Sequence, residues 1–130
     1  MNEKTALIID DDGDIREVLR VMLESGGFQV DSLPDGIDAL ELKKWYDVIV
    51  LDLKMPVFDG QRLTDYWQLT DPDILRRVIV LSGYSRLKMD QEPATFARLP
   101  KPFDYATLMK VIGDCITQGE ADSAARPSHV

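Results

Sequence analysis

A run of four branched apolar residues, Val48 to Leu51, ends abruptly on the carboxylate of Asp52. A run without polar alternation is typical of a strand buried on both faces of a parallel sheet. Pro56 and Gly60 follow and predict a break in the chain. Ligands and reactive groups gather beyond the carboxyl ends of strands in open α/β sheets. Asp52 therefore stands where the sequence predicts a reactive group.

Further apolar runs alternate with segments of helical periodicity. We expect strands near residues 5–9, 28–31, 47–51, 77–81 and 97–99. We expect helices over residues 14–25, 36–45, 60–69, 92–97 and 104–116, the fourth being short. A helix cap is expected at Asp12 or Asp14, and a helix stop at Gly26. The alternation predicts a doubly wound α/β fold, with a five-stranded parallel sheet in the order 2-1-3-4-5 and helices on both faces.

The length of 130 residues suits one domain with a hydrophobic core. We expect the domain to cover residues 1–117, and residues 118–130 to form a flexible C-terminal tail or the start of a linker. No signal-peptide pattern is present, and no apolar run reaches the roughly 20 residues that span a bilayer. The single cysteine, Cys115, is expected to be a buried, inert thiol. A cytoplasmic location without membrane attachment is the default expectation.

The net charge of −8 argues against direct nucleic-acid binding, which requires a basic face. The acidity is concentrated locally, because four aspartates fall between Asp10 and Asp14. That concentration calls for a chemical explanation.

Polar side chains follow the predicted strands at the same edge of the sheet: Asp10 and Asp11, Asp52, Ser82, and Lys101. The first and third strands are neighbours at the switch point, so their carboxylates converge. Carboxylates a few ångström apart repel by several kcal/mol at an effective dielectric of about 20. They would bind protons or a divalent cation, Mg2+ or Mn2+. A cation beside a carboxylate, a hydroxyl and a lysine is an arrangement for phosphoryl transfer, with Asp52 as the nucleophile.

Each of these residues has a simpler explanation when taken alone. Asp11 fits a helix cap, Ser82 a turn, and Lys101 a solvated surface lysine. The joint occurrence of these residue types at successive strand ends favours a site.

The motifs that carry these residues resemble the response-regulator receiver domain, the phosphoacceptor module of two-component signalling. They are Leu-Ile-Ile-Asp-Asp-Asp, Asp-Val-Ile-Val-Leu-Asp-Leu-Lys-Met-Pro, Val-Ile-Val-Leu-Ser-Gly and Lys-Pro-Phe. The resemblance covers about residues 5–117 and implies the (βα)5 flavodoxin-like form of the fold.

The resemblance also implies a role for each site residue. Asp52 would be phosphorylated and would bind the metal directly with Asp11 and the backbone carbonyl of Lys54. Asp10 would act through water. Ser82 and Lys101 would contact the phosphoryl group, and the peptide bond between Lys101 and Pro102 would be cis.

Receiver domains take the phosphoryl group from a phosphohistidine on a sensor histidine kinase or a histidine phosphotransfer protein, and commonly from acetyl phosphate. They catalyse their own phosphorylation and slow dephosphorylation, without conventional substrate turnover. The resemblance therefore implies a phosphorylatable signalling protein of a two-component system or phosphorelay, with a downstream protein target that the sequence does not name.

One position departs from the family pattern. An aromatic residue usually stands three positions before the lysine and turns inward in the switch, whereas this chain has Arg98. Burying an isolated guanidinium is costly, so the switch is expected to be atypical, or Tyr84 or Phe96 takes over the aromatic role. Pro93 also interrupts the expected fourth helix.

Alternative functions stay open at this point. A pseudo-receiver would act as a phosphorylation-independent protein-interaction module. A hydrolase of the aspartyl-phosphate type would need an acid two residues after the nucleophile, where Lys54 stands. A nucleotide-binding flavodoxin-like protein would need a glycine-rich loop after the first strand. The chain could be a stand-alone regulator, part of a longer regulator or part of a hybrid kinase, and a monomer or a weak homodimer.

Overall fold

The computed structural model describes residues 3–53, 60–82 and 95–125, the last three without their side chains. Five parallel strands form one sheet in the order β2-β1-β3-β4-β5, as the sequence predicts. Their bounds are β1 Lys4–Ile9, β2 Phe28–Leu33, β3 Val48–Asp52, β4 Val78–Ser82 and β5 Ala97–Pro100. Every residue of β3 and β4 is buried, which explains their uninterrupted apolar sequences.

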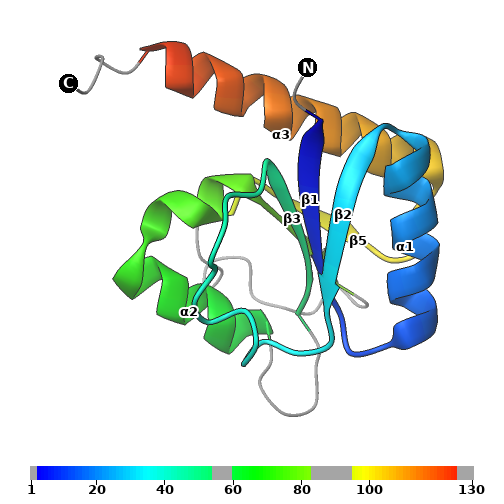
Figure 1. Cartoon of the computed structure of the whole chain (residues 1–130), viewed down its shortest axis with the longest axis horizontal. Helices are drawn as coiled ribbons and strands as arrows, with labels where there is room; N and C mark the ends of the chain where they lie inside the picture. Colours follow the sequence, from blue (N-terminus) through cyan, green and yellow to red (C-terminus); the bar gives the residue numbers. More distant parts are fainter. Residues whose placement is uncertain (1–2, 54–59, 83–94, 126–130) are drawn as a thin grey trace.

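Helical layers cover both faces of the sheet (Figure 1). The elements are α1 Gly13–Ser25, α2 Gly60–Thr70, the 3-10 helix η1 Pro72–Arg77, and α3 Tyr105–Ala125. Successive strand residues alternate between two core clusters. Leu7 and Ile9 of β1 pack with residues of α2 and η1. Ala6 and Ile8 pack with residues of α1 and α3.

Asp12, one of the two predicted capping residues, is the N-cap of α1. Its carboxylate accepts hydrogen bonds from the backbone N–H groups of Asp14 at 2.9 Å and Ile15 at 3.3 Å. Gly26 is the C-cap, and its N–H donates to the last turn of the helix. Gly27 has a φ of 92°, a conformation that glycine adopts without a steric cost. Local residues thus fix where α1 begins and ends, so that the acidic segment precedes the helix.

The helix expected over residues 36–45 is absent, and the segment between β2 and β3 consists of turns and bends (Figure 1). The Asp35 carboxylate accepts from the N–H of Asp38 at 3.0 Å. Single i→i+3 bonds follow from Ala39 to Gly36 and from Leu40 to Ile37. The bond from the Asp38 N–H to the Asp35 carboxylate gives the backbone an alternative to helical hydrogen bonding, and the segment adopts that alternative.

The apolar side chains of this segment do not form one stripe. Ala39 is fully buried, whereas the exposed fractions of Ile37 and Trp45 are 48% and 60%. The ring of Trp45 instead lies against the Arg77 guanidinium, 3.6 Å from the ring centroid. The spacing that predicted a helix therefore combined two surface side chains with the two leucines between them, which are partly buried against the core.

The C-terminal helix is longer than expected, because α3 continues to Ala125 instead of ending near residue 117. Gln118 donates to Asp122 one turn later at 2.9 Å, and Glu120 forms an ion pair with Lys4 at 3.2 Å. A polar pair one turn apart and an ion pair to a neighbouring strand stabilise these last turns, although their sequence lacks an apolar stripe. None of the described helices is long and apolar enough to cross a membrane.

Some expectations concern residues outside the described ranges. The short helix over residues 92–97 begins there, and its last residue, Ala97, belongs to β5. Lys54, Tyr84 and Pro93 also lie outside the described ranges. Two other expectations are confirmed: Cys115 is buried, and the peptide bond between Lys101 and Pro102 is cis.

Candidate functional site

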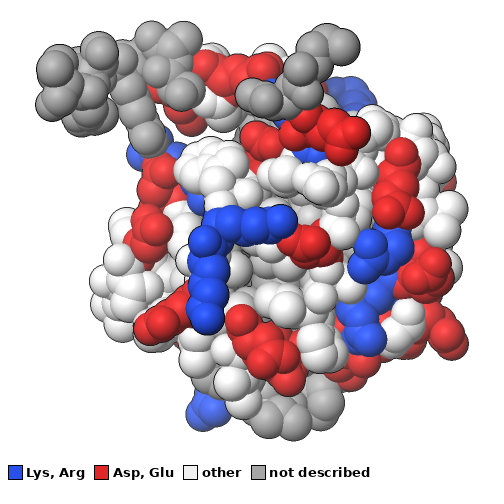
Figure 2. Space-filling view, viewed as in Figure 1, with Lys and Arg blue, Asp and Glu red and all other residues white. Residues whose placement is uncertain are grey.

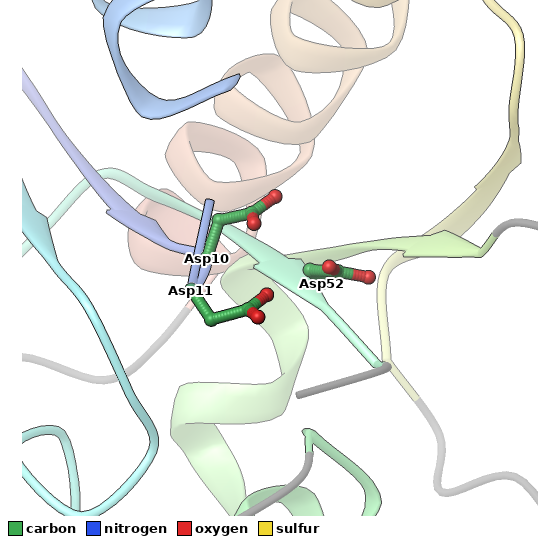
Figure 3. A group of neighbouring side chains, drawn as sticks. All are labelled: Asp10, Asp11 and Asp52. Carbon is green, nitrogen blue, oxygen red and sulfur yellow. The ribbon is translucent and has the colours of Figure 1, made fainter. Parts of the chain in front are cut away.

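Three aspartates meet at the carboxyl edge of the sheet. Asp10 and Asp11 follow β1, and Asp52 is the last residue of β3, the strand beside it. Each offers one carboxylate oxygen, and these oxygens lie within 4.8 Å of one another. Figure 3 shows the side chains of Asp10 and Asp11 extending from the end of β1 toward the side where Asp52 lies. The pairing of β1 with β3 thus brings together residues that are distant in the sequence.

Asp10 is the most buried of the three, with an exposed fraction of 1%. Its Oδ1 accepts a hydrogen bond from the N–H of Asp12 at 2.9 Å. Its Oδ2 has no hydrogen-bond partner among the described residues. Burial raises the pKa of Asp10 to about 6, and the nearby Asp52 carboxylate adds to this rise. Asp10 is therefore costly to ionise unless a positive charge approaches it.

Backbone contacts fix the position of Asp10. Its N–H donates to the carbonyl oxygen of Leu33 at the end of β2, at 3.2 Å. The Arg16 guanidinium donates to the carbonyl oxygen of Asp10 at 2.7 Å. This supporting role of Arg16 was not predicted from the sequence, although a cation one helical turn after an acidic segment is a usable signal. The backbone of Asp10 is consequently held by groups on two neighbouring elements, which fixes the point from which its carboxylate extends.

Lys101 brings a positive charge to Asp52. Its Nζ lies 3.6 Å from Oδ1 of Asp52, whose side chain is only 8% exposed. The N–H of Lys101 donates to the carbonyl oxygen of Ser82 at 2.8 Å, which ties the residue to the end of β4. The lysine thus places a positive charge beside a carboxylate that has little contact with solvent.

Ser82 ends β4 and is 2% exposed. Its hydroxyl oxygen accepts a hydrogen bond from Nε of Arg98 at 3.0 Å. Arg98 lies on β5, opposite Val80 of β4, and is half-buried. The sequence places an arginine at this position, but it does not reveal the contact with Ser82.

Gly60, the first residue of α2, lies directly against the end of β3. Its N–H donates to the carbonyl oxygen of Leu53 at 2.9 Å. A Cβ on Gly60 would lie 2.6 Å from the carbonyl oxygen of Asp52 and 2.7 Å from Cα of Leu53. Only glycine lets α2 begin this close to the end of β3. The sequence predicts a break in the chain at this glycine, but its steric role becomes evident only in the structure.

The donor set fits a divalent cation such as Mg2+. Carboxylate oxygens are hard ligands, which Mg2+ prefers. The unpartnered Oδ2 of buried Asp10 and the close approach of three acids both call for a positive charge beyond that of Lys101. Asp10, Asp11 and Asp52 are the described residues that could hold the ion or its water.

Residues 6–113 match the family model of the response regulator receiver domain. The chain belongs to this family. Sporulation initiation phosphotransferase F of Bacillus subtilis is 36% identical over 109 residues, which cover 80% of this chain and 86% of that protein. The C4-dicarboxylate transport transcriptional regulatory protein of Pseudomonas aeruginosa is 32% identical over 108 residues, 79% of this chain. This chain spans only 23% of that longer relative.

A solved structure supports the same family and the same kind of site. The receiver domain of a sensor histidine kinase from Pseudomonas aeruginosa, with a magnesium ion coordinated in its active-site cleft, has a TM-score of 0.79 and 25% identity. The match covers 89% of this chain and 99% of that one. The protein is thus a receiver domain of two-component signal transduction, a family whose members are phosphorylated and bind Mg2+ and interact with histidine kinases or phosphotransfer proteins.

Proposed function

We propose that Asp52 accepts a phosphoryl group from a phosphohistidine on a sensor histidine kinase or a histidine phosphotransfer protein. The observation that supports this most is the setting of Asp52 at the end of β3, paired with Lys101 and close to two further carboxylates. A carboxylate held in this way is an available nucleophile. A relative named a phosphotransferase adds support for a role in a phosphorelay.

The proposed transfer moves the phosphoryl group from an imidazole nitrogen of the donor to a carboxylate oxygen of Asp52. A carboxylate oxygen of Asp52 forms a bond to phosphorus, and the bond between phosphorus and the imidazole nitrogen breaks. The electron pair returns to the imidazole, which takes up a proton. Lys101 binds one phosphoryl oxygen and the Ser82 hydroxyl donates to another, so that charge is offset where it develops. Slow self-catalysed dephosphorylation reverses the modification when water attacks phosphorus.

The reaction requires Mg2+ or Mn2+. Asp11 and Asp52 would hold the ion directly, with the backbone carbonyl of Lys54, and Asp10 would hold it through water. A bound ion offsets the negative charge of the phosphoryl oxygens and the repulsion among the three carboxylates. The raised pKa of Asp10 is consistent with a carboxyl group that needs this compensation.

Phosphorylation is proposed to change a protein-interaction surface through an atypical switch. Arg98 stands where receivers usually carry an aromatic residue, and its bond to Ser82 gives it a polar role instead. The domain itself is proposed to act in the cytoplasm as a monomer or weak homodimer, without direct nucleic-acid binding. The charge of −8 supports the last point, and Figure 2 shows basic side chains set among acidic ones on one face.

Intact-mass spectrometry after incubation with acetyl phosphate and Mg2+ tests the proposal. The wild-type chain is expected to gain one phosphoryl group, and Asp52→Asn to gain none. Asp65→Asn removes an exposed carboxylate on α2 and serves as the matched control, which should be modified like the wild type. Absence of an adduct from acetyl phosphate and from phosphohistidine donors would instead favour a pseudo-receiver that acts by protein interaction alone.

A further inference from the structure

The bond between Arg98 and Ser82 joins the edge strand of the sheet to the site. Leu99, the neighbour of Arg98, packs in the core beneath α1 and α3. Because side chains alternate along a strand, Arg98 points to the opposite face, on the same side as Val80. From there its Nε reaches the Ser82 hydroxyl oxygen at 3.0 Å. The contact is therefore set by the register of β4 and β5.

The chemistry of the two groups gives this bond a direction. A guanidinium can only donate hydrogen bonds, so Ser82 must be the acceptor. A serine hydroxyl has one proton of its own and two lone pairs. When Arg98 occupies a lone pair, the hydroxyl proton must point elsewhere. A charged donor also polarises the hydroxyl and strengthens the bond that its proton makes.

We propose that Arg98 is a positioning residue that prepares Ser82 to donate its proton to a phosphoryl oxygen on Asp52. The inference rests on the proposed phosphorylation of Asp52 and adds a role for a residue on the neighbouring strand. A phenylalanine or tyrosine side chain at this position has no N–H with which to hold the Ser82 oxygen. The arginine therefore replaces a packing element with a hydrogen-bonded relay from Arg98 through Ser82 to the phosphoryl group.

Beryllium trifluoride with Mg2+ provides the test, because its fluorines stand in for the three phosphoryl oxygens without a covalent step. Affinity is measured by calorimetry for the wild type, Arg98→Ala, Ser82→Ala and the double variant. Each single variant is expected to bind the mimic about tenfold more weakly, because each substitution removes a hydrogen bond in which one partner is charged. The double variant should bind no more weakly than Ser82→Ala, because Arg98 acts through that hydroxyl.

A spectroscopic readout separates positioning from a general structural effect. In fluorine NMR spectra of the bound mimic, Arg98→Ala and Ser82→Ala should shift the same fluorine resonance and leave the others in place. Arg98→Lys keeps a donor and should restore part of the affinity. Arg20→Ala is the matched control, because Arg20 also donates to a serine hydroxyl, that of Ser32 at 3.1 Å, outside the acidic cluster. It should bind the mimic like the wild type.

The relay would be overturned if the loss of affinity in the double variant equalled the product of the two single losses. Wild-type affinity in Arg98→Ala would overturn it as well. These results leave the proposed function intact if the wild type still gains a phosphoryl group on Asp52. A wild-type chain that takes up neither a phosphoryl group nor the mimic refutes the proposed function, and the relay with it.

Discussion

Gly60 lies so close to the end of β3 that a methyl group on it would meet the carbonyl oxygen of Asp52 at 2.6 Å. Gly60→Ala must therefore move α2 or the strand end that carries Asp52, the proposed phosphoacceptor. We expect a loss of about 2 kcal/mol or more in the free energy of unfolding, as for other overpacked sites, and slower phosphorylation of Asp52. Denaturant unfolding and intact-mass time courses measure the two effects.

Gly113→Ala is the control for this substitution. A Cβ on Gly113 meets no atom within 4 Å, and the residue lies exposed on α3. Alanine should stabilise the chain there by up to about 1 kcal/mol through its higher helix propensity. Equal free energies of unfolding for Gly60→Ala and the wild type would contradict this expectation, because they would show that the end of β3 shifts to accommodate the methyl group without a measurable cost.

Asp10→Asn should stabilise the metal-free protein at neutral pH. Burial raises the pKa of Asp10 to about 6 from 3.8. Because the folded state binds this proton more tightly than the unfolded state does, protonated Asp10 stabilises the fold. This stabilisation is fully present below pH 3.8 and is lost as the pH rises through about 6. Asparagine mimics the protonated form, so the free energy of unfolding of the variant should exceed that of the wild type by about 3 kcal/mol at pH 7.5 and approach it near pH 4. Urea unfolding in chelator at both pH values measures the difference, and a constant difference would contradict the expectation.

Asp31→Asn should show the opposite dependence on pH. Lys44 Nζ at 2.8 Å and the Tyr46 hydroxyl at 2.6 Å donate to its carboxylate. The bond from Lys44, followed by that from Tyr46, lowers the pKa of Asp31. Its contribution to stability is present above pH 3.8 and is lost as the pH falls through the lowered folded value. The variant should lose up to about 1 kcal/mol at pH 7, since the group is partly exposed, and match the wild type in strong acid. Thermal unfolding across this range provides the measurement, with Asp65→Asn as an exposed control.

The Cys115 thiol should resist modification in the folded protein. Burial raises its pKa to about 11, and the thiol donates weakly to the carbonyl oxygen of Arg76. Because the thiolate is the reactive form, an aromatic disulfide reagent at pH 8 should react only as fast as the chain opens. In denaturant one thiol per chain should react at once. Rapid reaction of the native protein would show that this part of α3 opens readily.

The sequence predicts the sheet well because β3 and β4 are buried on both faces, and a strand of that kind must be apolar throughout. It also predicts that Asp10, Asp52 and Lys101 converge, since parallel strands end at one edge. The segment after Asp35 was predicted wrongly as a helix. There, a local carboxylate bond competes with helical hydrogen bonding, and periodicity alone does not weigh one against the other.

The extension of α3 was missed for a related reason. Its last turns are held by the ion pair between Lys4 of β1 and Glu120 and by the hydrogen bond within the helix from Gln118 to Asp122, rather than by an apolar stripe. The bond from Arg98 to Ser82 depends on strand register and side-chain reach. Neither quantity can be read from the identity of the two residues.

The alternation of core residues along β1 has an evolutionary consequence. Leu7 and Ile9 belong to one core cluster, and Ala6 and Ile8 belong to the other. The aspartates of the site lie at the ends of the strands, between the two clusters. Mutations can therefore accumulate on one side of the sheet without disturbing the packing of the other. The acids at the strand ends belong to neither cluster, so substitutions inside either core leave the residue types of the site unchanged.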